Sequence, residues 1–85
     1  MSKYLAMYRL HLAGSDRHES RQYIGGADTL AAAREMAAAY RVPDAHVANG
    51  TTAEVAVFRE RHNYDVGVTG YDIVDDWRAC GGGEA

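Results

Sequence analysis

The sequence predicts a small α+β domain in which one α-helix packs on one face of an antiparallel sheet of four or five strands, in the order ββαβββ or ββαββ. An alanine-rich stretch at residues 28–40 has helical periodicity, and the segments before and after it alternate as strands do. An Asn-Gly pair at residues 49–50 adds a strong hairpin signal. The 85 residues suit one domain. We place it at residues 1–78, followed by a flexible glycine-rich tail at residues 79–85.

The first expected strand covers residues 2–13. Its more apolar set of alternate residues predicts the face that contacts the core: Tyr4, Ala6, Tyr8, Leu10 and Leu12. Gly-Ser-Asp at residues 14–16 is typical of a turn, so a second strand should follow at about residues 19–24. The pair Gly25-Gly26 should then free the chain to turn into the helix.

The helix is expected at residues 28–40 because alanine loses no rotamer freedom in a helix. Asp28 is the predicted N-cap, since its carboxylate can accept an unpaired backbone N–H. One apolar stripe recurs at three- and four-residue spacing, formed by Leu30, Ala33, Ala37 and Tyr40. This stripe is the expected contact with the sheet.

The second half of the chain reads as further strands. Pro43 should end the helix, and a short extended piece at residues 45–48 should lead into an Asn-Gly hairpin turn. A strand is expected at residues 51–61. A two-residue turn at Asn63-Tyr64 would then join it to a strand at residues 66–74.

Apolar side chains fall on both faces of this last hairpin. The two-residue turn would pair Phe58 with Thr69 and Val57 with Gly70. One helix can cover only one face, so one of two sets needs other shielding: Phe58, Tyr71 and Ile73, or Val55, Val57 and Val68. A bulge at Gly70 would return Tyr71 and Ile73 to the covered face. A true contact surface is the alternative, and both interpretations stay open.

Composition argues against several kinds of chemistry. The four histidines, His11, His18, His46 and His62, lack the spacing of a metal site, and no cofactor-binding motif is present. Cys80 is the only cysteine, so an internal disulfide is excluded and a reducing, cytoplasmic setting is expected. No run of about 20 apolar residues and no signal-peptide pattern occurs. We therefore expect a non-catalytic protein without metal or cofactor.

Charge suggests two kinds of partner. Residues 51–85 carry three basic and seven acidic side chains, which indicates either a solvated surface or a contact for a basic partner. Trp77, beside two of these acids, either closes an edge of the core or anchors a partner.

Nucleic acid is the alternative partner, contacted by the first hairpin. Its candidate residues are Arg9, His11, Arg17, His18 and Arg21, with Tyr4, Tyr8 and Tyr23 available for base stacking. The net charge of -3 and the missing RNP aromatic motif weigh against it.

The stretch at residues 4–40 carries a resemblance. It contains a leading YLAMYRLHLA strand, a polar turn, QYIGG and the alanine-periodic TLAAAREMAAAY. This order resembles the small phage-encoded anti-CRISPR proteins directed at type I surveillance complexes. The resemblance implies an inhibitor that binds a crRNA-guided complex in a bacterial cytoplasm and blocks target DNA binding.

The resemblance also implies which side chains make the contact. Five acidic residues would imitate DNA phosphates for lysine and arginine on the target: Glu60, Asp65, Asp72, Asp75 and Asp76. An arginine- and tyrosine-led contact through the first hairpin stays open beside it. Self-association through an exposed sheet face is a further expectation from the residues.

Overall fold

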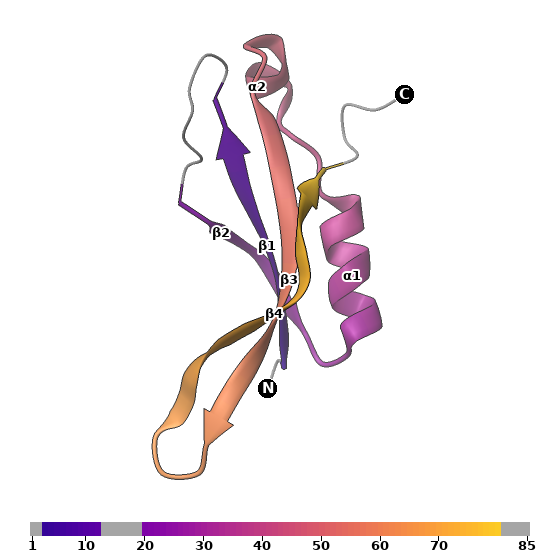
Figure 1. The fold of residues 1–85 in the computed structure, drawn as a ribbon. Helices are drawn as coiled ribbons and strands as arrows, with labels where there is room; N and C mark the ends of the chain where they lie inside the picture. Colours follow the sequence, from indigo (N-terminus) through magenta and orange to yellow (C-terminus); the bar gives the residue numbers. More distant parts are fainter. Residues whose placement is uncertain (1–2, 13–19, 81–85) are drawn as a thin grey trace.

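The computed structural model describes residues 3–12 and 20–80 and confirms the α+β class. Four antiparallel strands form one sheet in the order β2-β1-β3-β4, and a helix packs on it (Figure 1). The elements in chain order are β1 (Tyr4–His11), β2 (Gln22–Ala27), α1 (Leu30–Ala39), α2 (Asp44–Ala48), β3 (Thr52–Asn63) and β4 (Gly67–Ala79). None of the helices in this described part is long and apolar enough to span a bilayer.

The N-cap of helix α1 lies one residue later than the sequence suggested, and the helix itself begins at Leu30. Thr29 is the N-cap, and its Oγ1 accepts a hydrogen bond of 3.2 Å from the backbone N–H of Ala32. The prediction of Asp28 as the cap was therefore wrong, because the threonine beside it fits the same role. The predicted stripe is confirmed, since Ala33 and Ala37 are buried against the sheet.

The covered face of the sheet is built mainly from small residues. Ala6 of β1 lies opposite Val57 of β3, and Tyr8 lies opposite Val55. These side chains join the buried alanines of α1 in one core cluster. The Tyr8 ring also stacks on Tyr40, just after α1, with ring centroids 4.4 Å apart. The predicted core face of the first strand is thus confirmed for Ala6 and Tyr8.

The glycine pair lies within β2 and not in a loop after it. Gly25 pairs with Ala6, and Gly26 pairs with Leu5. A Cβ atom at Gly25 would lie 3.0 Å from the Met36 sulfur. The absent side chain therefore lets α1 approach the strand, which explains why the expectation of a loop failed. The predicted turn at residues 14–16 lies outside the described residues.

The Asn-Gly pair ends a short helix, α2, and does not form a hairpin. Gly50 has a φ of 79°, while Asn49 has a φ of -90°. A type I′ turn needs positive φ at both positions. Here the N–H groups of Gly50 and Thr51 donate to the carbonyls of Val47 and His46, both at 3.0 Å. This is a helix C-cap, which uses glycine for the same conformational reason.

The β3–β4 hairpin has a three-residue loop, not the predicted two-residue turn. Asn63 pairs with Gly67, whose φ is 82°, and Asn63 Oδ1 accepts a 2.8 Å hydrogen bond from the N–H of Asp65. The register consequently pairs Phe58 with Ile73 and not with Thr69.

An irregularity next to Arg61 and His62 lies opposite the strand around Gly70, where the sequence allowed a bulge. It does not return Ile73 to the covered face. Ile73 is paired with Phe58, and paired residues of antiparallel strands point to the same side. That structural interpretation of the bulge was wrong.

Strand β4 continues beyond the boundary predicted at residue 78. It ends at Ala79, and the Cys80 N–H donates to the Ala53 carbonyl at 2.9 Å. The Cys80 thiol donates to the Tyr40 carbonyl at 3.3 Å. Cys80 therefore belongs to the packed domain. The remainder of the predicted tail, residues 81–85, lies outside the described residues.

Candidate protein-interaction surface

The face of the sheet opposite α1 carries a second, smaller apolar cluster. Leu5, Ala56 and Phe58 are buried there, and Met7 and Trp77 pack against them. All five side chains come from the sheet itself, and neither α1 nor α2 takes part. This face therefore buries its centre without a second layer.

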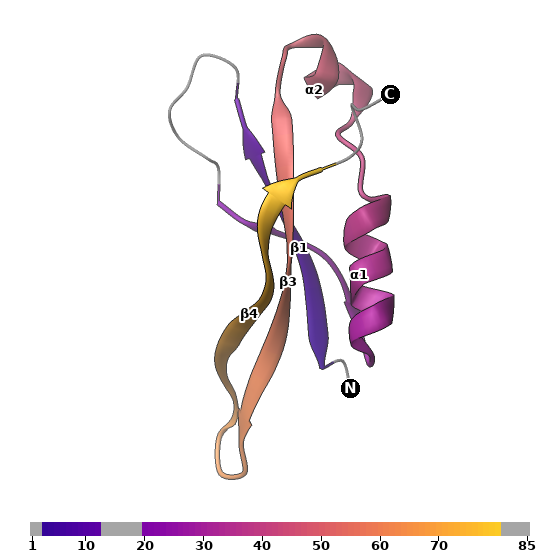
Figure 2. The same ribbon diagram turned by 45° about the vertical axis from the view of Figure 1, so that its right-hand side comes forward.

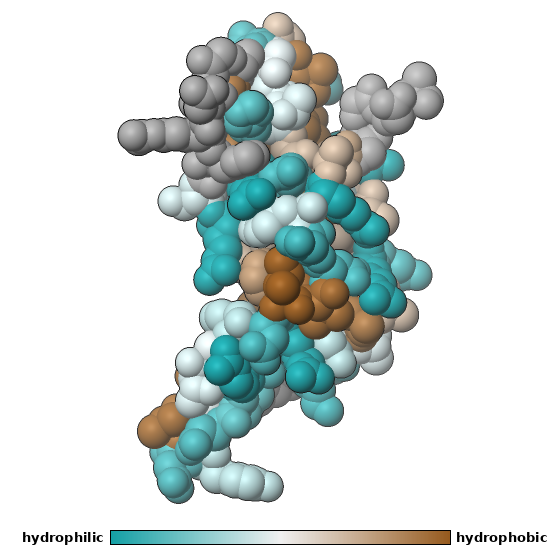
Figure 3. Space-filling model, viewed as in Figure 1, coloured by the Kyte–Doolittle hydropathy of each residue, from teal (hydrophilic) through white to brown (hydrophobic). Residues whose placement is uncertain are grey.

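Exposed apolar side chains extend this cluster. Tyr23 pairs with Met7 and is 59% exposed, and Ile73 pairs with Phe58 and is 46% exposed. Because paired residues share a side, both extend the same surface. We call this surface the sheet patch, formed by Leu5, Met7, Tyr23, Phe58, Ile73 and Trp77. Figure 3 shows hydrophobic side chains near the middle of the molecule, where β4 crosses the sheet, with hydrophilic ones around them.

Two arginines cover the aromatic rings of the sheet patch. The Arg9 guanidinium lies 4.3 Å from the Trp77 ring centroid, and the Arg21 guanidinium lies 5.1 Å from that of Phe58. Trp77 also meets Phe58 edge to face, with centroids 5.9 Å apart. Arg9 is held in place by Glu54, whose Oε1 accepts from Nε at 2.8 Å. Trp77 thus closes this cluster while staying partly accessible.

The β3–β4 hairpin projects from the body of the molecule as an arm. The last β1–β3 pair joins Tyr4 to Arg59, and the Glu60 N–H still donates to the Lys3 carbonyl at 2.9 Å. Beyond Glu60, β3 pairs only with β4 (Figures 1 and 2). We call residues 60–71 the arm. At its tip Tyr64 is fully exposed, and Val66 is 71% exposed. A two-stranded ribbon is only marginally stable by itself in water. The exposed Tyr64 and Val66 side chains do not add packing to its tip.

The arm is braced by polar contacts. Arg61 Nη2 lies 3.1 Å from Asp72 Oδ1, and Thr69 Oγ1 donates to the Arg61 carbonyl at 3.2 Å. Together with the hydrogen bond from Asp65 N–H to Asn63 Oδ1, these contacts restrain the loop. The tip is consequently presented in an organised conformation.

The five acidic residues predicted to imitate phosphates do not form one surface. Glu60 lies on the arm beside His62, with Oε1 and Nε2 3.1 Å apart. Asp75 lies on the helix side, where Arg34 of α1 donates two hydrogen bonds of 2.8 and 3.0 Å to its carboxylate. This hydrogen-bonded arginine holds the pKa of Asp75 below its ordinary value. Asp72 is already paired with Arg61.

The other two acids are placed differently. Asp65 lies in the loop at the tip of the arm, between Tyr64 and Val66. Asp76 Oδ1 accepts a 2.7 Å hydrogen bond from the backbone N–H of Trp77. Three of the five carboxylates therefore already contact cationic or imidazole side chains of their own chain, which leaves Asp65 as the acid best placed for a partner.

The predicted nucleic-acid surface is divided between the two faces. Arg9 and Arg21 lie over the sheet patch, whereas Tyr4 and Tyr8 pack into the core cluster under α1. Stacking of bases on these two tyrosines is therefore blocked. Tyr23 alone of the three is exposed, and His11 is half-buried at the end of β1. Arg17 and His18 lie outside the described residues.

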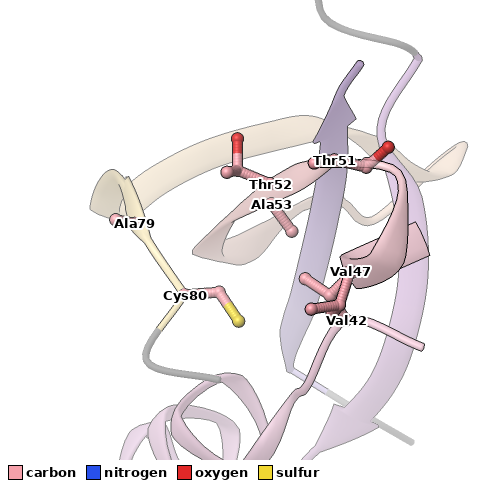
Figure 4. A pocket seen from close by; sticks show the side chains of 8 residues that line it. Val42, Val47, Thr51, Thr52, Ala53, Ala79 and Cys80 are labelled. Atoms are coloured by element: carbon pink, nitrogen blue, oxygen red, sulfur yellow. The ribbon is translucent and has the colours of Figure 1, made fainter. Parts of the chain in front are cut away.

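Neither of two hollows formed by the described residues gathers carboxylates. One of about 350 Å³ lies between α2 and the adjoining ends of β3 and β4, where Val42, Val47, Ala53 and the Cys80 thiol line it (Figure 4). The other, of about 300 Å³, lies at the base of the arm beside Glu60. Within residues 3–12 and 20–80, no three histidine, cysteine or acidic side chains converge into a metal-binding group.

The chain has no significant match to a protein-family model, to a curated protein or to a solved structure.

Proposed function

We propose that this protein is a non-catalytic binding module whose arm docks into a protein partner. The observation that carries the proposal is the placement of Tyr64 and Val66, fully or largely exposed, at the tip of a projecting hairpin. Aromatic side chains are enriched among the residues that dominate binding energy. A side chain that is exposed in its own chain is available to contact another protein.

The tip is suited to a concave site with a basic rim. Tyr64 and Val66 flank Asp65, so an apolar pocket that receives the two would bring its edge close to the carboxylate. The hydrogen bond from the Asp65 N–H to Asn63 Oδ1 restrains the loop before binding. Such preorganisation lowers the conformational entropy that binding costs.

The proposed target is a type I crRNA-guided surveillance complex in a bacterial cytoplasm. Support comes from the ββαββ arrangement of strands and α1, which resembles small anti-CRISPR proteins, and from the Asp65 carboxylate at the tip, which suits a DNA-receiving channel rich in lysine and arginine. In this proposal the arm occupies part of the path of the target DNA, and inhibition is stoichiometric.

The test uses a purified type I surveillance complex and labelled target DNA in a gel-shift assay. Added protein should abolish the DNA shift at roughly equal molar amounts. The double variant Tyr64→Ala, Val66→Ser should weaken inhibition by tenfold or more, since hot-spot residues contribute about 2 kcal/mol or more each. Val47→Ser on α2, half exposed and far along the chain from the arm, is the matched control and should inhibit as well as the parent.

Two results would decide against the proposal. If the surveillance complex still binds its target DNA in the presence of excess protein, the proposed target is wrong. If the double variant Tyr64→Ala, Val66→Ser inhibits as strongly as the parent protein, the arm is not the contact. Direct binding of labelled RNA or DNA by the protein alone, lost steeply as salt rises, would instead favour the nucleic-acid alternative through Arg9 and Arg21.

A further inference from the structure

We infer that a second copy of this chain covers the sheet patch, so that two molecules pair face to face around a two-fold axis. This inference goes beyond the proposed function and uses a different surface, because the arm tip with Tyr64 and Val66 lies outside the patch.

The composition of the core is the first argument for a second copy. Six of the ten buried apolar residues are alanines, and Val57 is the only large side chain that is fully buried among the described residues. Small domains bury a modest fraction of their surface even with large side chains. A core built from such small side chains contributes little hydrophobic stabilisation. Burying the exposed part of the sheet patch, above all Ile73 and Tyr23, would therefore add to the stability of the chain.

The shape of the molecule is the second argument. The radius of gyration is 14.0 Å, whereas a compact domain of this length has about 12 Å. The accessible surface is 5721 Å², whereas a folded monomer of 9.3 kDa exposes about 5,000 Å². The chain is therefore more extended, and exposes more surface, than a compact monomer of its length, in part because the arm projects from the body.

The available area fits such a contact. A face about four strands wide and eight residues long, with ~4.8 Å between strands and ~3.4 Å per residue, spans about 500 Å². The same side of the arm continues it through Val68 and Tyr71, both more than 40% exposed. Counting both parts, the face is large enough for a contact smaller than the ~800 Å² that each partner contributes to a standard interface.

Charge on this face suits a copy of itself. The Arg21 guanidinium lies over Phe58, and Glu60, two residues farther along β3, faces the same side towards the arm. A two-fold axis near the Phe58–Ile73 pair would bring Arg21 of each copy towards Glu60 of the other, beside the His62 ring that already contacts Glu60 at 3.1 Å. In an isologous contact this complementarity is satisfied twice.

Sedimentation velocity of the full 85-residue protein between about 1 and 200 μM measures the association state directly. We expect a concentration-dependent shift from the 9.3 kDa monomer to a species of twice that mass. Ile73→Asp should abolish the shift. Val47→Asp, at 50% exposure against 46% for Ile73, is the matched control and should leave it unchanged. Circular dichroism confirms that each variant is folded.

A charge exchange tests the orientation even if Ile73→Asp fails to fold. Arg21→Glu and Glu60→Arg should each weaken self-association by about tenfold or more, because each places like charges opposite one another twice. Mixing the two variants in equal amounts should restore pairing as a heterodimer. A contact between the two residues within one chain would give no such rescue.

Trp77 reports the same event optically, because it is the only tryptophan and belongs to the sheet patch. Its emission should shift to shorter wavelength as concentration rises, in parallel with the mass. A monomer throughout the concentration range overturns the inference, as does a dimer that Ile73→Asp, in a folded protein, and both charge variants leave unchanged. Neither result bears on the arm tip with Tyr64 and Val66, whose test is inhibition of the surveillance complex.

Discussion

The two faces of this sheet bury their apolar centres with different kinds of residue. The covered face uses small side chains, such as Ala6 and Val57, so that the alanines of α1 can approach closely. The uncovered face uses large rings, Phe58 and Trp77, and covers them partly with the side chains of Arg21 and Arg9. An alanine-faced helix packs closely against small neighbours, whereas on the face without a helix the large side chains shield one another.

The largest expected effect compares the neighbours Phe58 and Val57, which point to opposite faces. Phe58→Ala should lower the free energy of unfolding by about 3 kcal/mol, because Phe58 is 6% exposed and its removal leaves a cavity. Val57→Ala should cost about 2 kcal/mol, since two methyl groups and their packing are lost. Urea denaturation followed by circular dichroism measures both, at one protein concentration.

A cost below about 1 kcal/mol for Phe58→Ala would break the comparison, since exposed positions give values of that size. The uncovered face would then be surface and not core. Phe58→Leu is the matched control and should cost less than the alanine variant, because it retains most of the buried volume.

A smaller effect is expected at the N-terminus of α1, the helix that packs only on the covered face. Thr29→Ala should destabilise the protein by about 1 kcal/mol through loss of the side-chain acceptor for the Ala32 N–H. Thr29→Asp should retain stability, because its carboxylate can accept the same bond and favours the positive end of the helix dipole. Thermal unfolding of the two variants side by side provides the measurement, and equal losses in both would refute the cap.

The smallest effect concerns the link between α1 and β4. The hydrogen bonds from Arg34 lower the pKa of Asp75 from its ordinary 3.8. A carboxyl whose folded pKa is lowered contributes stability above its unfolded pKa, and loses it as pH falls through the folded value. A carbon-13 NMR titration should therefore show Asp75 titrating below 3.8. Arg34→Ala should move that midpoint upward, with a small change in stability because the pair lies at the surface.

The helix and the strands of the body were predictable because their signals are local. The stripe with Ala33 and Ala37, and the alternation that buries Ala6 and Tyr8, are both read directly from spacing. The Asn-Gly pair misled, because positive φ at Gly50 serves a helix C-cap as readily as a hairpin turn. Only the neighbouring hydrogen bonds distinguish the two.

The candidate surface was only partly predictable. Leu5 and Met7 alternate with the core face of β1, so an apolar second face was visible in the sequence. The contact of Arg9 with Trp77, 68 positions later in the chain, depends on tertiary pairing that no local pattern encodes. The register of the arm depended on the position and length of the loop, and a loop at residues 64–66 instead of 63–64 changed every partner.

The irregular course of β4 has a consequence for how the molecule can assemble. A straight, apolar border strand would invite neighbouring molecules to add along it indefinitely, as in fibrils. Here the border is interrupted by register shifts and carries Asp72 and Asp76. Lateral growth is thereby discouraged, and any union of two molecules stays finite.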